Sequence, residues 1–274
     1  MLFYAIVVTK FIILYYFTAI IVLAADPPYG QLSVNNGKLT GSNGNTLRGV
    51  SLWFSQWSTE FYSSSVVRST KCTFNSNVIR AAIGPEANGY FDNLDNAINA
   101  ATTVGDAAIH YGIYFIIDFH HGGPSCDNQD EMDKFTNKAI QFFTKILDKY
   151  KGSPNLLLEL WNEPHCTWDK ISEYHSKVLD AIRRIDPNVV CILGTPNASS
   201  GPTSEVVNNP LRVSNIIYTM HWYPVSDPGH INAQYKIIDN AIRNNVGIFV
   251  SEYGDADVTP GAQLDKAKTK RLFV

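Results

Sequence analysis

Short apolar runs alternate with longer amphipathic stretches from residue 47 onward, and no other feature restricts the possible fold as strongly. Near-continuous apolar runs of strand length are typical of parallel strands that are buried on both faces. The amphipathic stretches between them have the length of helices, so the alternation predicts repeated βα units around a parallel sheet. We predict strands at 47–53, 77–83, 113–119, 155–161, 189–193, 215–220 and 248–251.

The predicted helices lie between these strands, at 58–69, 91–111, 129–150, 169–185 and 231–244. A polar segment before them, 31–46, predicts a hairpin that caps one end of the domain. The natural completion of this α/β pattern is a (β/α)8 TIM barrel of roughly 250 residues. No eighth apolar run follows Glu252, so we expect a barrel truncated after the seventh strand. Either it is unclosed, with two edge strands, or the chain is a fragment of a longer one.

Residues 1–25 are almost wholly apolar, and they end in small residues before Asp26. This pattern is typical of a secretory signal peptide cut after Ala24 or Ala25. An uncleaved membrane anchor is the alternative, because the stretch is long enough to reach across most of a bilayer. The favoured interpretation predicts a secreted, extracellular protein with one domain over 26–274 and no membrane contact after cleavage.

Charge and cysteine content restrict the partners. The net charge is −3 and no basic run is long, so nucleic acid is not an expected partner. We further expect a monomer. Cys72, Cys126, Cys166 and Cys191 allow up to two disulfides in three connectivities. Cys126 and Cys166 follow the third and fourth strands and are candidates to pair, whereas Cys191 fits a buried thiol.

Polar residues repeatedly follow the predicted strands. His120 follows the third strand, Glu163 the fourth, His221 and Tyr223 the sixth, and Glu252 the seventh. Barrel enzymes assemble their active sites at this C-terminal face. Two acids there, with histidine and tyrosine on neighbouring strands, therefore predict a site.

Glycoside cleavage is the chemistry that needs two carboxyl groups, one as proton donor and one as nucleophile or base. Retaining enzymes hold the pair ~5–5.5 Å apart and inverting enzymes ~6.5–9.5 Å apart. The fourth and seventh strands face each other across a barrel, where long side chains can close to the shorter range. We therefore predict retention for Glu163 and Glu252.

Two motifs, 160–164 (Leu-Trp-Asn-Glu-Pro) and 248–254 (Ile-Phe-Val-Ser-Glu-Tyr-Gly), resemble those of glycoside hydrolase family 5. Within it the chain is most similar to secreted β-1,4-endoglucanases of the bacterial type, over about 32–257. The resemblance implies a (β/α)8 barrel, no cofactor or metal, and a retaining double displacement on cellulose-like β-1,4-glucan. It further implies that 26–274 is a catalytic domain whose eighth βα unit is absent.

Residue by residue, the resemblance implies that Glu163 is the acid/base, Glu252 the nucleophile and Asn162 the contact to the sugar 2-hydroxyl. The residues expected around the two acids are Arg80, His120, His221 and Tyr223.

The expected roles also have a physical basis. Arg80 and Tyr223 near Glu252 would keep its pKa low through charge and hydrogen bonding. Glu163, flanked by Trp161 and away from Arg80, is more easily held protonated.

Aromatic residues offer candidate sugar platforms, since Trp53, Trp57 and Trp222 have flat apolar faces. Ordinary core packing is the alternative for each of them, and the position of Trp222 beside the matched residues favours a packing or rim role for it. Two positions depart from the family pattern. The tryptophan expected on the eighth strand is absent from this sequence, and Ala198 stands where the family tends to carry a tryptophan after the fifth strand.

Several alternatives remain. Glu159 lies inside the fourth strand and is read as a structural residue of the barrel interior. A metal-dependent hydrolase could use His120 and His221, with Asp118 as a further candidate ligand. The truncated barrel could instead be inactive or bind glucan without cleaving it, and mannan or xylan could replace cellulose.

Overall fold

The computed structural model describes residues 26–85, 88–223 and 228–254. The signal peptide predicted for residues 1–25 lies outside this range, as does the chain after Gly254. Within the described part, no helix has the length and apolar character needed to cross a membrane.

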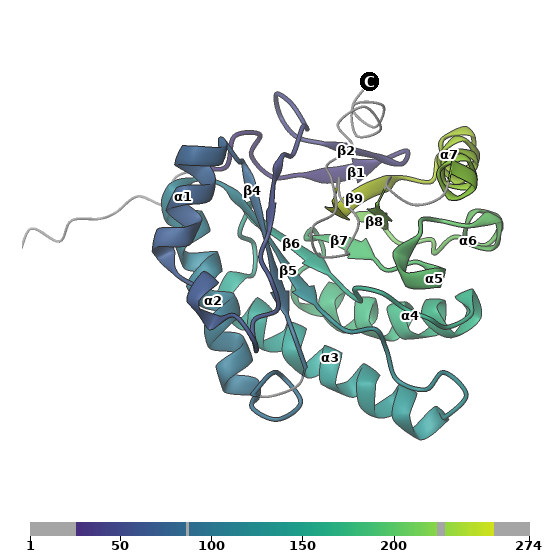
Figure 1. Ribbon diagram of the computed structural model, residues 1–274, viewed down its shortest axis with the longest axis horizontal. Coiled ribbons are helices and arrows are strands. Elements are labelled where there is room, and N and C mark those ends of the chain that lie inside the picture. Colours follow the sequence, from purple (N-terminus) through teal and green to yellow (C-terminus); the bar gives the residue numbers. More distant parts are fainter. Residues whose placement is uncertain (1–25, 86–87, 224–227, 255–274) are drawn as a thin grey trace, which may run out of the picture.

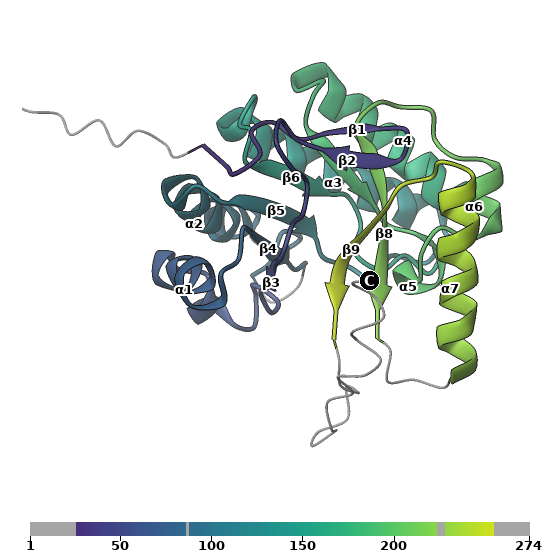
Figure 2. The same ribbon diagram turned by 90° about the horizontal axis from the view of Figure 1, so that it is seen from above.

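Seven parallel strands form a nearly closed barrel, and each pairs with the next in sequence order (Figures 1 and 2). Within the described residues, the first and the last of the seven are the edge strands and no eighth strand lies between them, as predicted for a barrel truncated after the seventh strand. The strands are β3 (Gly49–Ser51), β4 (Val78–Ile83), β5 (Tyr114–Phe119), β6 (Leu156–Glu159), β7 (Val190–Leu193), β8 (Ile216–Trp222) and β9 (Ile248–Tyr253). All seven predicted strands are present, but β8 and β9 each continue two residues further than expected.

Helices surround the sheet, with α1 and α2 at one side of the molecule and α7 at the other (Figure 1). The long helices are α1 (Ser64–Phe74), α2 (Leu94–Tyr111), α3 (Gln129–Tyr150), α4 (Trp168–Ile185) and α7 (Pro228–Arg243). The helix predicted from residue 58 is wrong at its start, because a 3-10 turn η1 (Thr59–Phe61) comes first and Ser63 caps α1. Two short helices, α5 (Pro196–Ser199) and α6 (Ser204–Asn208), were not predicted.

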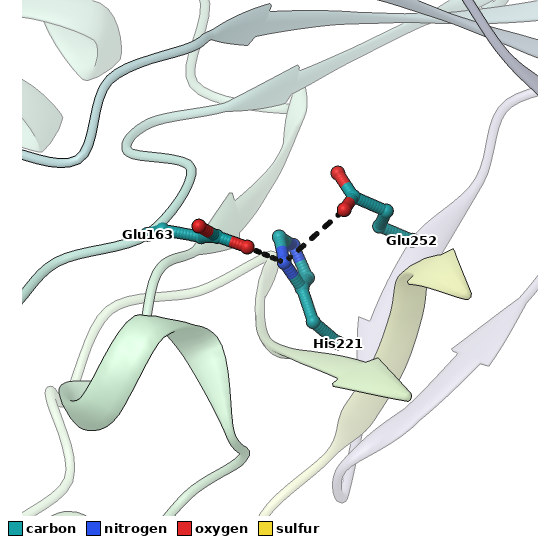
Figure 3. A group of neighbouring side chains, drawn as sticks. All are labelled: Glu163, His221 and Glu252. Carbon is teal, nitrogen blue, oxygen red and sulfur yellow. Dashed lines mark hydrogen bonds and ion pairs between the residues drawn. The ribbon is translucent and has the colours of Figure 1, made fainter. Parts of the chain in front are cut away.

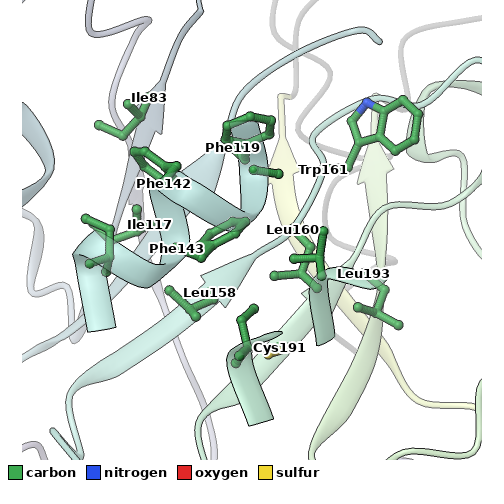
Figure 4. Packing of buried hydrophobic residues seen from close by; sticks show 14 of the residues in the cluster. Ile83, Ile117, Phe119, Phe142, Phe143, Leu158, Leu160, Trp161, Cys191 and Leu193 are labelled. Atoms are coloured by element: carbon green, nitrogen blue, oxygen red, sulfur yellow. The ribbon is translucent and has the colours of Figure 1, made fainter. Parts of the chain in front are cut away.

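The outward faces of the strands pack against these helices. In β5, Phe119 and Ile117 point outward, and Phe119 contacts Phe142 and Phe143 of α3 at centroid distances of 5.5 and 5.9 Å (Figure 4). Because side chains alternate along a strand, the residues between them point into the barrel. The central strands β4 to β8 are therefore buried on both faces, which explains their continuous apolar runs.

The N-terminal half of the barrel interior is filled by apolar side chains, which we call the lower interior. Its members are Leu32, Leu39, Val78, Tyr114, Ile116, Leu157, Val190, Ile192 and Ile217. Leu32 and Leu39 come from the hairpin of β1 (Ser33–Asn35) and β2 (Lys38–Thr40). The predicted cap is thus confirmed, and it closes the end of the barrel.

A disulfide joins Cys126, after β5, to Cys166, after β6, with their Cα atoms 5.5 Å apart. This is the pairing that the strand order suggested. Cys191 is a buried free thiol, as expected, and Cys72 is free and exposed.

Candidate active site

Charged and polar side chains occupy the C-terminal half of the barrel interior, which we call the upper interior. Four of them lie two residues beyond a member of the lower interior, since the strand period is two: Arg80 follows Val78, Asp118 follows Ile116, and Glu159 and Thr219 stand in the same relation to Leu157 and Ile217. The set comprises Arg80, Asp118, Glu159, Thr219, His221, Ser251 and Glu252.

Arg80 is the centre of this set. Its guanidinium contacts Glu159 at 2.7 Å, Asp118 at 2.9 Å and Glu252 at 3.0 Å. Nη2 also donates to Oδ1 of Asn162 at 2.7 Å. The guanidinium fork satisfies several acceptors at once, and a buried charge needs such partners to offset its desolvation. Arg80 thus links the two sides of the site.

The environment of Glu252 favours its ionised form. Burial raises its pKa, but the charges of Arg80 and His221 and a hydrogen bond donated by the Tyr223 hydroxyl outweigh burial and lower it. The prediction that Arg80 and Tyr223 keep this pKa low is confirmed.

A β-bulge between β8 and β9 delivers Glu252 to the site. Thr219 pairs with Phe249, whereas His221 pairs with Glu252, so β9 has one extra residue. Consecutive residues Ser251 and Glu252 therefore both reach the interior, and Ser251 donates to Glu159 at 2.7 Å. Sequence reasoning missed Ser251, because an alternating pattern places it on the opposite face from Glu252.

Glu163 meets Glu252 across His221 (Figure 3). Nδ1 of His221 lies 2.9 Å from Oε1 of Glu163 and 3.9 Å from Oε1 of Glu252. One ligand atom from each of the three residues lies within 4.8 Å of the other two. The two acids predicted from strands four and seven are thus brought together.

His221 is buried and 4% exposed. Burial lowers its pKa, but Glu159, Glu163 and Glu252 together raise it to about 9. The imidazole is therefore charged at neutral pH and can donate a hydrogen bond to Glu163.

A cleft of about 620 Å³ opens above these groups. Its lining includes both acids, Arg80, Asn162, His120, Tyr223, Trp53, Trp57 and Tyr253. Trp57 is 54% exposed, so its ring is available at the cleft as predicted. Nδ1 of His120 donates to Oδ2 of the Asp118 carboxylate at 2.6 Å, and the His120 ring stacks edge-on against Phe54.

Comparison with known proteins agrees with this geometry. The sequence profile described as Cellulase (glycosyl hydrolase family 5) matches residues 35–272. The chain belongs to glycoside hydrolase family 5. It is 31% identical over 254 residues to Endoglucanase A of Butyrivibrio fibrisolvens and 33% identical over 245 residues to Endoglucanase Z of Dickeya dadantii. Each match covers 87% of this chain and 55% of the relative, so the chain spans about half the length of these relatives.

Solved structures of the family share the barrel. A structure from Cytophaga hutchinsonii has a TM-score of 0.80 and 33% identity, covering 89% of this chain and 78% of that one. The catalytic domain of Thermobifida fusca endoglucanase Cel5A has a TM-score of 0.79 and 27% identity, covering 89% and 80%. A Glu-to-Gln variant of that domain in complex with cellotetraose has a TM-score of 0.78, with the same identity and coverage.

The structure distinguishes the roles of two tryptophans in this family 5 chain. Trp222 is 0% exposed and packs against Tyr235, which is the packing role considered for it and not that of a sugar platform. Trp161 packs into the core, 4.8 Å from the rings of both Phe135 and Tyr174. The neighbour that contacts Glu163 is instead His221.

The metal alternative built on His120 and His221 also does not match the geometry. Asp118 and His120 bind each other, and Asp118 also pairs with Arg80. Within the part of the chain that the structure describes, the group spaced for a metal is Glu163, His221 and Glu252, without His120. All three are among the residues that the sequence resemblance placed at the predicted glycoside-cleaving site.

Proposed function

We propose that the chain is an endo-β-1,4-glucanase that hydrolyses cellulose-like β-glucan with retention of anomeric configuration. The supporting observation is the convergence of Glu163 and Glu252, which each place one carboxylate oxygen within 4.8 Å of the other and of a ring nitrogen of His221. This separation suits a direct attack by one carboxylate, which needs ~5–5.5 Å between the pair, rather than the ~6.5–9.5 Å that accommodates a water.

The environments of the two acids support their assignment. Glu252, held ionised beside Arg80 and Tyr223, attacks the anomeric carbon and forms a glycosyl ester. Glu163, which is one-third exposed, gives its proton to the leaving oxygen and then takes one from the water that hydrolyses the ester. Because Oδ1 of Asn162 is bound to Arg80, its amide N–H is free to donate to the sugar 2-hydroxyl.

The cleft fits a neutral polysaccharide. Trp53 and Trp57 are both more than half exposed at its mouth and offer faces for sugar rings, whereas its floor presents hydrogen-bonding groups. An equatorial 2-hydroxyl suits the Asn162 contact, which favours glucan or xylan over mannan. Release of reducing sugar from carboxymethylcellulose, xylan and mannan in parallel distinguishes these substrates.

Glu163→Gln and Glu252→Gln test the assignment. Each should lower kcat on carboxymethylcellulose by about 10³-fold or more, since a positioned acid or base contributes 10²–10⁴-fold, and leave the Tm near that of the unmodified protein. NMR of the first-formed anomer should show retention. Activity that persists in both variants would refute the pair, and a folded but inert unmodified protein would favour a glucan-binding role.

We also propose that the protein is secreted and monomeric. The disulfide supports secretion, because such bonds persist in oxidising compartments. Expression of the full chain in a eukaryotic secretory host, with N-terminal sequencing of the medium protein, tests cleavage near Ala25. Light scattering coupled to size exclusion tests the oligomeric state.

A further inference from the structure

Glu159 is a buried carboxylate that the two-acid mechanism does not use. It is 0% exposed and ends β6, four residues before Glu163. Its Oε2 accepts from Nε of Arg80 at 2.7 Å, and its Oε1 accepts from the Ser251 hydroxyl at 2.7 Å. Both carboxylate oxygens are thus held in fixed positions.

The same carboxylate faces His221. Oε1 of Glu159 lies 3.8 Å from Nε2 of His221, which has no hydrogen-bond partner among the described residues. On the other edge of the ring, Nδ1 lies 2.9 Å from Glu163. The imidazole therefore stands between two carboxyl groups, and only a doubly protonated ring presents N–H to both.

We propose that Glu159 is a positioning residue for proton donation, because it holds His221 in its charged form and in a fixed orientation toward Glu163. The imidazolium N–H then donates a hydrogen bond to Oε1 of Glu163, so that the proton delivered to the leaving oxygen is carried by Oε2. After the transfer, the same N–H stabilises the new Glu163 carboxylate.

The charges around the ring agree with this role. Glu159 and Glu163 face His221 from β6 and the loop after it, Glu252 from β9 and Arg80 from β4. Arg80 opposes the charge on His221, and the three carboxyl groups favour it. Burial raises the pKa of Glu159, but Arg80 and His221 hold it at about 2, so this carboxylate stays ionised throughout the working range.

Titration of His221 in Glu159→Gln, followed by NMR of its ring nitrogens, is the decisive experiment. The unmodified protein should keep His221 charged well above pH 7, and the neutral, isosteric variant should move its titration to lower pH by at least one unit. Asp118→Asn is the matched control, because it removes the other buried carboxyl group within 3 Å of Arg80 but does not face His221. That control should leave the His221 titration in place.

Activity gives a second readout. The phenolate of an aryl β-cellobioside with an acidic phenol leaves without protonation, whereas the sugar that leaves during cleavage of a polysaccharide needs a proton. Glu159→Gln should therefore lower kcat/KM on polysaccharide by about 10²-fold, the scale expected for a misplaced catalytic group. The loss of kcat/KM on the aryl glycoside should be smaller by a factor of at least about ten.

Because this role belongs to the acid step, it rests on the proposed function, but the titration does not need an active enzyme. An unmodified protein inert on both substrates would reject the proposed function alone. An ordinary His221 titration near pH 6.5 in the unmodified protein would overturn the role of Glu159, even if the variant failed to fold. Equal losses of kcat/KM on both substrates in Glu159→Gln, with the His221 titration unchanged, would also overturn it, because a purely structural role gives that outcome.

Discussion

The lower and upper interiors of the barrel share strands β4, β5, β6 and β8, two residues apart on each, yet one is apolar and the other is charged and polar. Val78 precedes Arg80 and Leu157 precedes Glu159, so one step of strand period converts apolar packing into buried charge. Apolar burial contributes about 25 cal/mol per Å² and tolerates substitutions that conserve volume. Buried ion pairs add little net stability but are costly to break. The lower interior therefore stabilises the barrel, and the upper interior uses that stability to hold charges in place.

Arg80→Met should break the upper interior and give the largest effect. It leaves Asp118, Glu159 and Glu252 without their shared cation, and removing one partner of a buried pair costs about 3–5 kcal/mol. Loss of Arg80 also removes a charge that lowers the pKa of Glu252, so the acid limb of the activity profile should move to higher pH.

Urea denaturation and a pH profile of kcat/KM measure these two effects. Arg80→Lys is the control, since it keeps the charge but not the fork that reaches three carboxylates. It should recover part of the stability and little of the activity. An unchanged urea midpoint in Arg80→Met would contradict the contrast between the two interiors.

Leu157→Ala should affect only the lower interior. Truncating a fully buried leucine costs about 2–5 kcal/mol through lost burial and the cavity left behind. The kcat of the folded fraction should stay unchanged, because Leu157 packs in the apolar cluster of the lower interior. Leu157→Met should lower the stability much less. A specific loss of kcat in Leu157→Ala, measured well below its Tm, would mean that the two layers are coupled.

Removal of the disulfide, which lies in the loops after β5 and β6, should lower the stability without changing the charged groups of the upper interior. Cys126 and Cys166 are 40 residues apart in sequence, and closing such a loop contributes about 2–4 kcal/mol. The double replacement by serine should lower the Tm accordingly, while the contacts of Arg80 and thus the pH profile stay as they are. Cys72→Ser, at an exposed free thiol, is the control and should change nothing. A shifted pH profile in the double variant would show that these loops help to set the charges below them.

Sequence reasoning predicted the architecture and the approach of Glu163 to Glu252, because each depends on local patterns: apolar runs and acids that follow strands. It failed where the outcome depends on how far a strand continues. β8 extends to Trp222, so strand parity turns His221 inward and Trp222 outward into the core. The bulge that brings in both Ser251 and Glu252 is set by pairing with β8, which no local pattern encodes.

Sequence reasoning placed His221 around the two acids without deciding which of them it contacts. The choice depends on side chains that meet from β8, β9 and the loop after β6. Likewise α5 and α6 span four and five residues, too short for a helical period to be visible.

The smallest expected effect is the pH dependence of the free energy of unfolding, which should come from the upper interior and not from the lower one. The pKa of His221 is raised in the folded protein to about 9, above its ordinary value of 6.5. Its contribution to stability is therefore complete below pH 6.5 and is lost as the pH rises toward 9, by on the order of 1 kcal/mol between pH 6.5 and 8. His221→Gln should lack this slope, whereas Leu157→Ala should keep it, since its deficit comes from apolar contacts that do not titrate. Urea denaturation at pH 6, 7, 8 and 9 measures all three proteins. If the free energy of unfolding changed with pH equally in the unmodified protein and His221→Gln, the histidine would be neutral in the folded protein. Arg80 would then be the one cation between the carboxylates of the upper interior.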